Sequence, residues 1–196
     1  IGGDTAQAGA WPTLFGSVMS LCTCFLVIPV VNGMAQRYGK RFTFLFSQSI
    51  SLFGYILLWW CFSPQNPSMM FIPLPLVAFG IGGLFTLMMS MTADICDLDE
   101  LETGERREGT FGAIYWWMVK LGAAFAGGAA GLILSAIGFD QSITEQSEST
   151  LVMLRLSYIV VPCVGTLIAI FVMRNYDLDE ARAKDIRAQL DARQAV

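Results

Sequence analysis

Residues 94–108, DICDLDELETGERRE, carry nine charged side chains within fifteen positions. Seven of these are carboxylates, and Arg106 and Arg107 are the cations. Such a set fits three kinds of site: a Mg²⁺ site, a solvated loop with internal ion pairs, or a gate whose carboxylates pair with arginines in only one conformation. A Mg²⁺ site of a membrane-embedded lipid or prenyl-transfer enzyme usually needs a second acidic cluster on another helix. No other apolar run of this sequence has one.

Lys120 lies inside an otherwise apolar run, residues 109–137, about 16 Å from its start if the run is helical. A lysine near the middle of a membrane costs several kcal/mol unless it faces water or an anion. Its side chain reaches only about 6 Å, which is too short to snorkel from that depth. We therefore expect Lys120 to be ion-paired or to border a wet cavity.

Trp116 and Trp117 precede Lys120 by four and three residues, so all three share one helix face. A cation beside indole rings suits a polar, ring-shaped solute, because an indole packs on the apolar face of a sugar. The alternative is that the tryptophans form an interfacial belt or contact lipid.

The elements that position these residues are predicted to be membrane-spanning helices. The 196-residue chain is 55% hydrophobic and 14% charged, whereas soluble domains are about 25% charged. Five apolar runs, at residues 11–35, 42–62, 71–93, 109–137 and 151–173, are each long enough to cross a bilayer. Lipid offers no partner to free backbone groups, so the runs should be helices, and none alternates as a barrel strand would. The predicted fold is an all-α polytopic bundle over residues 1–174.

The basic residues indicate the orientation. The connector before residue 42, the connector 94–108 and the tail hold ten of the twelve, and the other two connectors hold none. The positive-inside rule then places the C-terminus in the cytoplasm and residue 1 outside, which we expect of a piece of a longer chain. Residues 175–196 are predicted to form a cytoplasmic amphipathic helix with a loose apolar stripe, although a frayed tail is the alternative. The stripe consists of Leu178, Ala181, Ile186 and Leu190.

Glycine is concentrated in the third and fourth runs, where small residues let helix backbones approach closely. The third run holds Gly80, Gly82 and Gly83, and the fourth holds Gly122, Gly127, Gly128 and Gly131.

The five cysteines are interpreted as small apolar fillers and there is no histidine, so no resident metal site is predicted. Nothing indicates a nucleic-acid partner.

Two motifs carry a family resemblance. GMAQRYGKR, residues 33–41, resembles the loop motif that joins the second and third helices of each half of a major facilitator superfamily transporter. Residues 91–122 are similar to the signature of the glycoside–pentoside–hexuronide:cation symporters, the melibiose-carrier family. The tail also resembles the ending of that family. The residues that match the signature are Ala93, Asp94, Asp97, Arg107, Gly109 and Lys120.

The resemblance implies helices 8–12 of a twelve-helix carrier in an inner or plasma membrane. Such a carrier is not an enzyme; it moves a sugar-like solute together with Na⁺ or H⁺ by alternating access. The ligands of the coupling cation would lie mostly in an N-terminal half outside these residues, and no other cofactor is expected. Lys120 would border the solute and cation pocket, and Phe85 and Trp116 would approach the sugar. The expected partners are the solute, membrane lipid and the N-terminal half.

The basic turn, residues 33–41, and the acidic segment, residues 94–108, are expected to lie on the same side of the membrane and to act as a cytoplasmic gate. Gly39 permits the positive φ that a tight turn needs. The residues predicted for this gate are Arg37, Gly39, Lys40, Arg41, Asp94, Asp97, Arg106 and Arg107. The rival classes are the Mg²⁺-dependent membrane enzyme using residues 94–108 and a purely structural membrane subunit.

Overall fold

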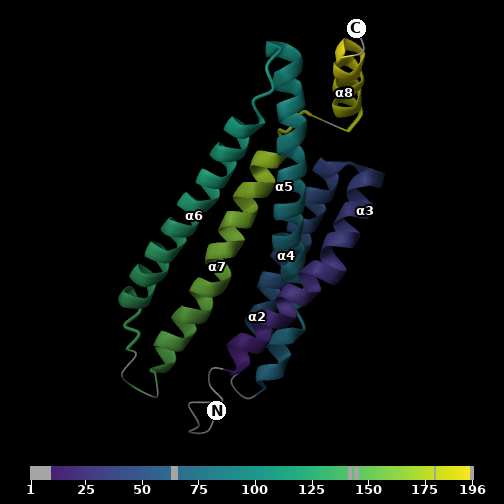
Figure 1. Ribbon diagram of the computed structural model, residues 1–196. Helices are drawn as coiled ribbons and strands as arrows, with labels where there is room; N and C mark the ends of the chain where they lie inside the picture. The colour runs from purple at the N-terminus through teal and green to yellow at the C-terminus, as the bar shows by residue number, and fades with distance from the viewer. Residues whose placement is uncertain (1–9, 63–65, 141–142, 144–145, 179, 195–196) are drawn as a thin grey trace. The chain divides into compact units, whose positions relative to one another are not determined.

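The structure is a computed structural model that describes residues 10–62, 66–140, 143, 146–178 and 180–194 (Figure 1). These residues form helices and turns and contain no strand, which confirms the predicted all-α fold. The elements in chain order are α2 (Ala10–Cys22), the π-helical turn η1 (Thr23–Val27), α3 (Ile28–Tyr38), α4 (Lys40–Cys61), the 3₁₀ turn η2 (Pro67–Phe71), α5 (Leu74–Thr103), α6 (Glu108–Ala136), α7 (Glu148–Met173) and α8 (Glu180–Gln194).

Five helical stretches of the described chain are long and apolar enough to cross a membrane: Thr13–Tyr38, Lys40–Cys61, Ser68–Thr103, Glu108–Ala136 and Glu148–Met173. Each overlaps one predicted run. The third continues ten residues beyond its predicted end at residue 93, so the expectation of a connector from Asp94 to Thr103 is wrong. Loss of apolarity marks where a helix leaves lipid, not where it ends, and Leu and Glu are good helix formers.

The chain forms two compact units. Unit 1 is Ile1–Met91 with Pro162–Glu180, and unit 2 is Thr92–Val161 with Ala181–Val196. Helices α5 and α7 each contribute residues to both units.

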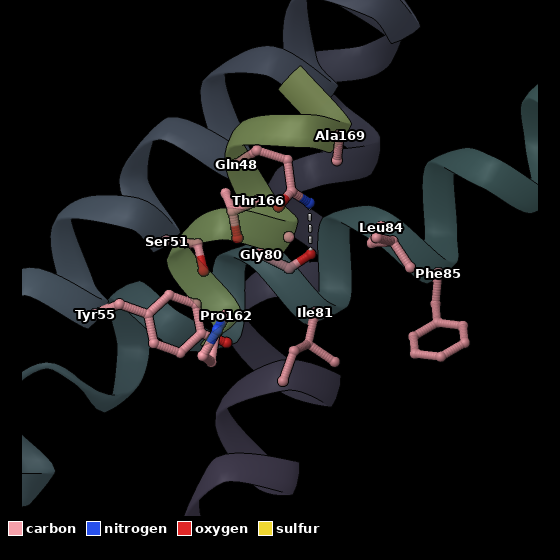
Figure 2. A pocket seen from close by; sticks show the side chains of 11 residues that line it. Gln48, Ser51, Tyr55, Gly80, Ile81, Leu84, Phe85, Pro162, Thr166 and Ala169 are labelled. Atoms are coloured by element: carbon pink, nitrogen blue, oxygen red, sulfur yellow. Dashed lines mark hydrogen bonds between the residues drawn. The ribbon is translucent and has the colours of Figure 1, made fainter. Parts of the chain in front are cut away.

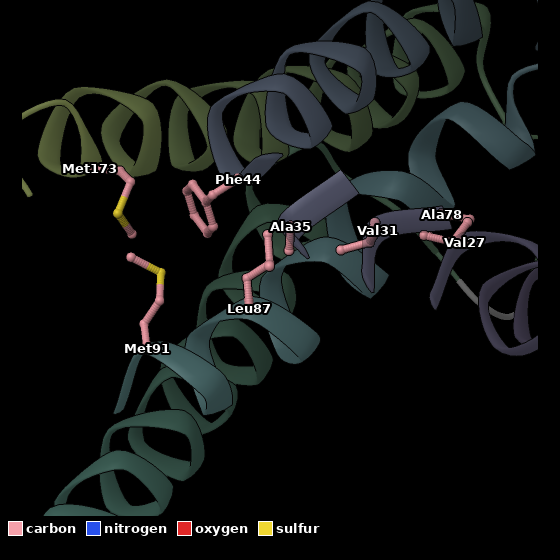
Figure 3. Close-up of a cluster of buried hydrophobic side chains, with 8 residues drawn as sticks. All are labelled: Val27, Val31, Ala35, Phe44, Ala78, Leu87, Met91 and Met173. Carbon is pink, nitrogen blue, oxygen red and sulfur yellow. The ribbon is translucent and has the colours of Figure 1, made fainter. Parts of the chain in front are cut away.

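A buried apolar cluster forms the core of unit 1 (Figure 3). Val27, Val31 and Ala35 recur every four residues, so they form one stripe along the end of η1 and α3. Leu87 and Met91 form a similar stripe on α5, and Figure 3 shows the ends of the Met91 and Met173 side chains directed toward one another. The other members of the cluster are Phe44, Ala78 and Met173.

Helices α4 and α5 approach each other closely in unit 1. A Cβ added at Gly80 would lie 2.2 Å from Ser51 Oγ, and one at Gly83 would lie 2.4 Å from Ser47 Oγ. Ser47 and Ser51 are almost fully buried. The glycines of the third run therefore serve close helix packing, as small residues in membrane helices commonly do. Within the described chain, by contrast, a Cβ at Gly122, Gly127, Gly128 or Gly131 of α6 would meet nothing within 4 Å.

Unit 2 contains the end of α5, all of α6, the first part of α7 and nearly all of α8. Gly104, with φ 75°, ends α5, and Gly138, with φ 69°, follows α6. Helix α6 has no buried residue within the described structure. In α8, Ile186 and Leu190 are buried, and the Arg193 guanidinium donates to the Leu101 carbonyl at 2.8 Å.

Candidate functional site

The basic turn between α3 and α4 forms where Gly39 adopts φ 85°, a value that other residues rarely take. The Thr43 hydroxyl donates to the Gly39 carbonyl at 2.8 Å, which fixes the start of α4. Lys40 Nζ donates to the Ser90 carbonyl at 3.5 Å, and the Arg41 guanidinium donates to the Arg174 carbonyl just beyond α7. Arg41 thus binds a carbonyl just beyond the C-terminal end of a helix, where positive charge is favourable, whereas Lys40 binds a carbonyl in the middle of α5.

The acidic segment and its two arginines form an ion-pair network at the junction of α5 and α6. Arg106 Nη1 lies 2.7 Å from Glu100 Oε2 and 3.7 Å from Asp97 Oδ1, and Arg106 Nη2 also pairs with Glu108. Hydrogen bonds to Glu108 and then to Glu100 raise the pKa of Arg106 above its ordinary value. These bonds hold the Arg106 guanidinium against the carboxylates of Glu100 and Glu108.

Arg107 makes a two-point contact with Asp99, with Nε donating to Oδ2 at 2.8 Å and Nη2 donating to Oδ1. The hydrogen bond to Asp99 is the main cause of the raised pKa of Arg107. Residues 94–108 therefore contain internal ion pairs, although residues 94–103 belong to α5 and do not form a loop. No group of three or more Asp, Glu, Cys or His side chains in the described residues is placed to hold a metal ion. Pairing of Arg37 or Arg41 with Asp94 or Asp97 stays a prediction.

Lys120 and its two tryptophans lie on the exposed surface of α6. Trp116 is 47% exposed and Trp117 is 62% exposed, and Lys120 is exposed as well. The ring of Tyr115 packs edge-on against that of Trp116 at 5.4 Å between centroids. The described part of unit 2 therefore leaves this face open, and the predicted solute contacts of Lys120, Trp116 and Trp117 stay predictions.

Phe85, the fourth residue predicted to contact the solute, lines a cavity of about 250 Å³ in unit 1 (Figure 2). The cavity lies between α4, α5 and α7. Figure 2 shows the Phe85 ring at the edge of the group, apart from Tyr55 and Pro162. Phe85 is 43% exposed, so only part of its surface belongs to the cavity wall.

Three buried polar residues line this cavity and were not singled out from the sequence: Gln48, Ser51 and Thr166. Gln48 Nε2 donates to the Gly80 carbonyl at 3.0 Å, and Ser51 Oγ donates to the Val77 carbonyl at 3.4 Å. These bonds join α4 to α5 and use one amide N–H of Gln48 and the hydroxyl of Ser51. The surface of the cavity is mostly apolar. The sequence did contain a signal for two of them: Gln48 and Ser51 lie three residues apart in the apolar run 42–62, and polar side chains inside a membrane helix need hydrogen-bond partners.

Residues 1–180 match the family described as MFS/sugar transport protein. The chain belongs to the major facilitator superfamily. Its resemblance to the glycoside–pentoside–hexuronide:cation symporters is likewise confirmed by this match and by the relatives of the chain. This superfamily member is a multi-pass membrane protein.

Several curated relatives of this major facilitator chain are named as carriers. It is 29% identical over 184 residues to the glucuronide carrier protein homolog of Escherichia coli (strain K12). This alignment covers 94% of this chain and 40% of the relative. It is 28% identical over 173 residues to the isoprimeverose transporter of Lactiplantibacillus pentosus, covering 88% and 36%. It is 31% identical over 164 residues to a putative sulfoquinovose importer of Salmonella typhimurium, covering 81% and 33%. The chain thus spans two fifths or less of the length of these relatives.

Proposed function

We propose that this chain is the C-terminal part of a secondary active transporter that moves a sugar or glycoside together with Na⁺ or H⁺ by alternating access. The observation that carries the proposal is the family match over residues 1–180, whose description is sugar transport. The names of three relatives, a glucuronide carrier protein homolog, an isoprimeverose transporter and a putative sulfoquinovose importer, point to the same class of solute. The activity is transport, not catalysis.

In this proposal the five candidate spans are helices 8–12 of a twelve-helix carrier in an inner or plasma membrane. Helices 1–7 precede them and supply most ligands of the coupling cation. The C-terminus lies in the cytoplasm, which the basic residues before residue 42, in residues 94–108 and in the tail support.

Lys120 is the proposed coupling residue. It lies twelve residues into α6, a 29-residue helix, and is therefore deep in the membrane if the helix stands upright. A cation at that depth is stabilised by water, a solute or a carboxylate. Because α6 exposes Lys120 and Trp116, both are available to a cavity shared with the preceding half of the carrier.

The proposed cytoplasmic gate uses the groups at the ends of α3–α5 and at the start of α6. Arg37, Lys40 and Arg41 flank Gly39 in the basic turn, and the ion pairs of Arg106 and Arg107 hold the end of α5 to the start of α6. Asp94 and Asp97 would exchange partners with the basic turn as the cytoplasmic side closes and opens.

The test is Lys120→Ala in the full-length carrier, with Lys184→Ala in the exposed part of the tail as the control. Gradient-driven accumulation of a labelled glycoside in membrane vesicles should fall at least about tenfold in Lys120→Ala and stay unchanged in the control. Coupled uptake that equals wild type would remove Lys120 from the mechanism.

The same vesicles address the rival enzyme. The proposal expects uptake that depends on an ion gradient, whereas turnover of a lipid substrate that needs Mg²⁺ and no gradient would favour the enzyme. The engagement of Asp97, Asp99 and Glu100 by arginines supports transport over a Mg²⁺ site. A purely structural subunit predicts no solute-dependent stabilisation of the carrier.

A further inference from the structure

A second cavity of unit 1, about 130 Å³ in volume, lies at the end of α3 next to the basic turn. It shares no residue with the cavity between α4, α5 and α7. Its lining comes from α3, α5, the first residue of α4 and the first residue of α8. We call it the α3–α5 hollow, and its lining residues are Asn32, Ala35, Gln36, Lys40, Thr86, Leu87, Ser90 and Glu180.

Four uncharged polar residues line this hollow in two matched pairs. Asn32 and Gln36 are four residues apart on α3, and Thr86 and Ser90 are four residues apart on α5, so each pair lies on one helix face. Carboxamides and hydroxyls both donate and accept hydrogen bonds. The buried residues Leu87 and Ala35 add an apolar part to the lining.

The charges at the hollow point to a neutral ligand. Lys40 supplies one cation, with its Nζ 3.5 Å from the Ser90 carbonyl, and Glu180 supplies one carboxylate. A Cβ added at Gly39 would lie 4.0 Å from the Glu180 Cβ, which shows that the start of α8 lies against the basic turn. A simple anion would meet Glu180 and a simple cation would meet Lys40, so neither sign is favoured.

The position of the hollow suits the end of a transport path. Asn32 and Gln36 precede the last residue of α3 by six and two positions, which corresponds to about 9 Å and 3 Å along the helix axis. This end of α3 carries the basic turn and is cytoplasmic in the proposed orientation. The hollow therefore lies between the membrane interior and the cytoplasm.

We propose that the α3–α5 hollow is a second solute site, which binds the hydroxyl-rich edge of a neutral sugar on the cytoplasmic side as the sugar leaves the carrier. This inference rests on the proposed function, because it takes the solute to be a sugar. Ligand pockets that enclose a whole small molecule are about 300–1,000 Å³. A hollow of about 130 Å³ holds only part of a pyranose ring, which suits weak binding and release.

The first test compares the two sides of the full-length carrier. In the double variant Asn32→Leu with Thr86→Val, the KM for the labelled sugar measured from the cytoplasmic side should rise at least about threefold, since each lost neutral hydrogen bond weakens binding by that order. The KM from the outside should stay within about twofold of wild type. Ser17→Ala is the control, because this exposed hydroxyl bonds only within α2 as far as the described residues show.

The second test measures occupancy without transport. Ser90→Cys in a cysteine-free carrier is alkylated by a membrane-impermeant maleimide in inside-out vesicles, with methyl glucoside, methyl xyloside or alanine as the added probe. The methyl glycosides should slow alkylation at least about threefold, and the zwitterion alanine should not.

The outcomes separate this inference from the proposed function. A carrier that moves sugar while the glycosides leave both the alkylation rate and the cytoplasmic KM unchanged would overturn the hollow as a sugar site. Protection by alanine alone would also overturn it. A wild-type carrier that moves no sugar contradicts the proposed function, and protection of Ser90→Cys would then still support a polyol site.

Discussion

At the scale of single residues, Gly80 determines how closely two helices approach. The position of its missing Cβ is 2.2 Å from Ser51 Oγ, and its carbonyl accepts the hydrogen bond from Gln48. Gly80 thus lets α4 and α5 approach closely and also provides the hydrogen-bond acceptor for the buried side-chain amide of Gln48. Gly165 of α7 also lines the cavity between α4, α5 and α7, but a Cβ there would meet nothing within 4 Å in the described structure.

This contrast gives a prediction with a matched control. Gly80→Ala should destabilise the carrier by about 1–3 kcal/mol, because the added methyl group must displace Ser51 or part the helices. Gly165→Ala adds the same methyl group to open space and should change stability little. The measurement is the midpoint of thermal aggregation of the detergent-solubilised full-length carrier. Equal midpoints for the two variants would contradict the close packing of α4 on α5.

At the scale of elements, the junction of α5 and α6 shows how charges shape a short connector. Helix α5 ends at Thr103, Gly104 turns the chain, and α6 begins at Glu108. Arg106 and Arg107 reach back to carboxylates six to eight positions earlier and bind the last turns of α5. The connector is therefore held at both ends.

Removal of one carboxylate should loosen this connector. In Asp99→Ala, Arg107 loses both of its hydrogen bonds to that side chain, so trypsin should cleave at Arg106 and Arg107 about twofold faster or more. Glu102→Ala is the control, because the structure gives exposed Glu102 no ion pair among the described residues. Unchanged cleavage in Asp99→Ala would show that the turn at Gly104, not the ion pair, limits access.

Helix α8 is the second element that supports a prediction. Ile186 is 4% exposed and Leu190 is 7% exposed, whereas Ala181 of the same helix is exposed. Burying an Ile or Leu side chain is worth about 1.5–3 kcal/mol. Ile186→Asp should therefore release α8, which limited proteolysis of inside-out vesicles would detect as faster loss of the tail.

Ala181→Asp is the matched control for the tail, because it adds the same carboxylate at an exposed position of α8. It should leave the rate of tail cleavage near that of wild type. Identical, rapid cleavage of wild type and both variants would mean that the tail is already open, as in a frayed terminus.

At the scale of the whole molecule, the basic residues predict the orientation. Alkaline phosphatase fused after Asp140 should be active, because it forms its disulfides only outside the cytoplasm. A fluorescent protein fused after Gln194 should be fluorescent, because that end is predicted to be cytoplasmic. The reverse pattern of the two reporters would contradict the proposed topology and the position of the gate.

The membrane spans could be predicted from the sequence because burial in lipid demands long apolar runs. The end of α5 could not, because Asp94–Thr103 is too polar for lipid yet suits a helix whose carboxylates bind Arg106 and Arg107. Of the predicted apolar stripe of the tail, Ile186 and Leu190 are buried on α8 and Ala181 is exposed, whereas Leu178 is buried but lies before the start of the helix.

The site was less predictable than the spans. Contacts such as Gln48 with Gly80, or Arg41 with Arg174, depend on which helix faces meet, and a single sequence does not encode that plainly. The role of Lys120 stays a prediction, because α6 has no buried residue in the described structure.

The wide π turn from Thr23 to Val27 has a consequence for mapping the first span. The residues that touch the core cluster are Met19, Cys22, Val27, Val31 and Ala35, with an interval of five residues at the turn instead of three or four. A helical wheel drawn with 3.6 residues per turn through the whole span would misplace the inner face of one half by roughly 100°. A shortened variant lacking one residue in this turn would restore the ordinary interval of four, so a regular α-helix would keep residues 10–22 facing the core and only the local bulge would be lost.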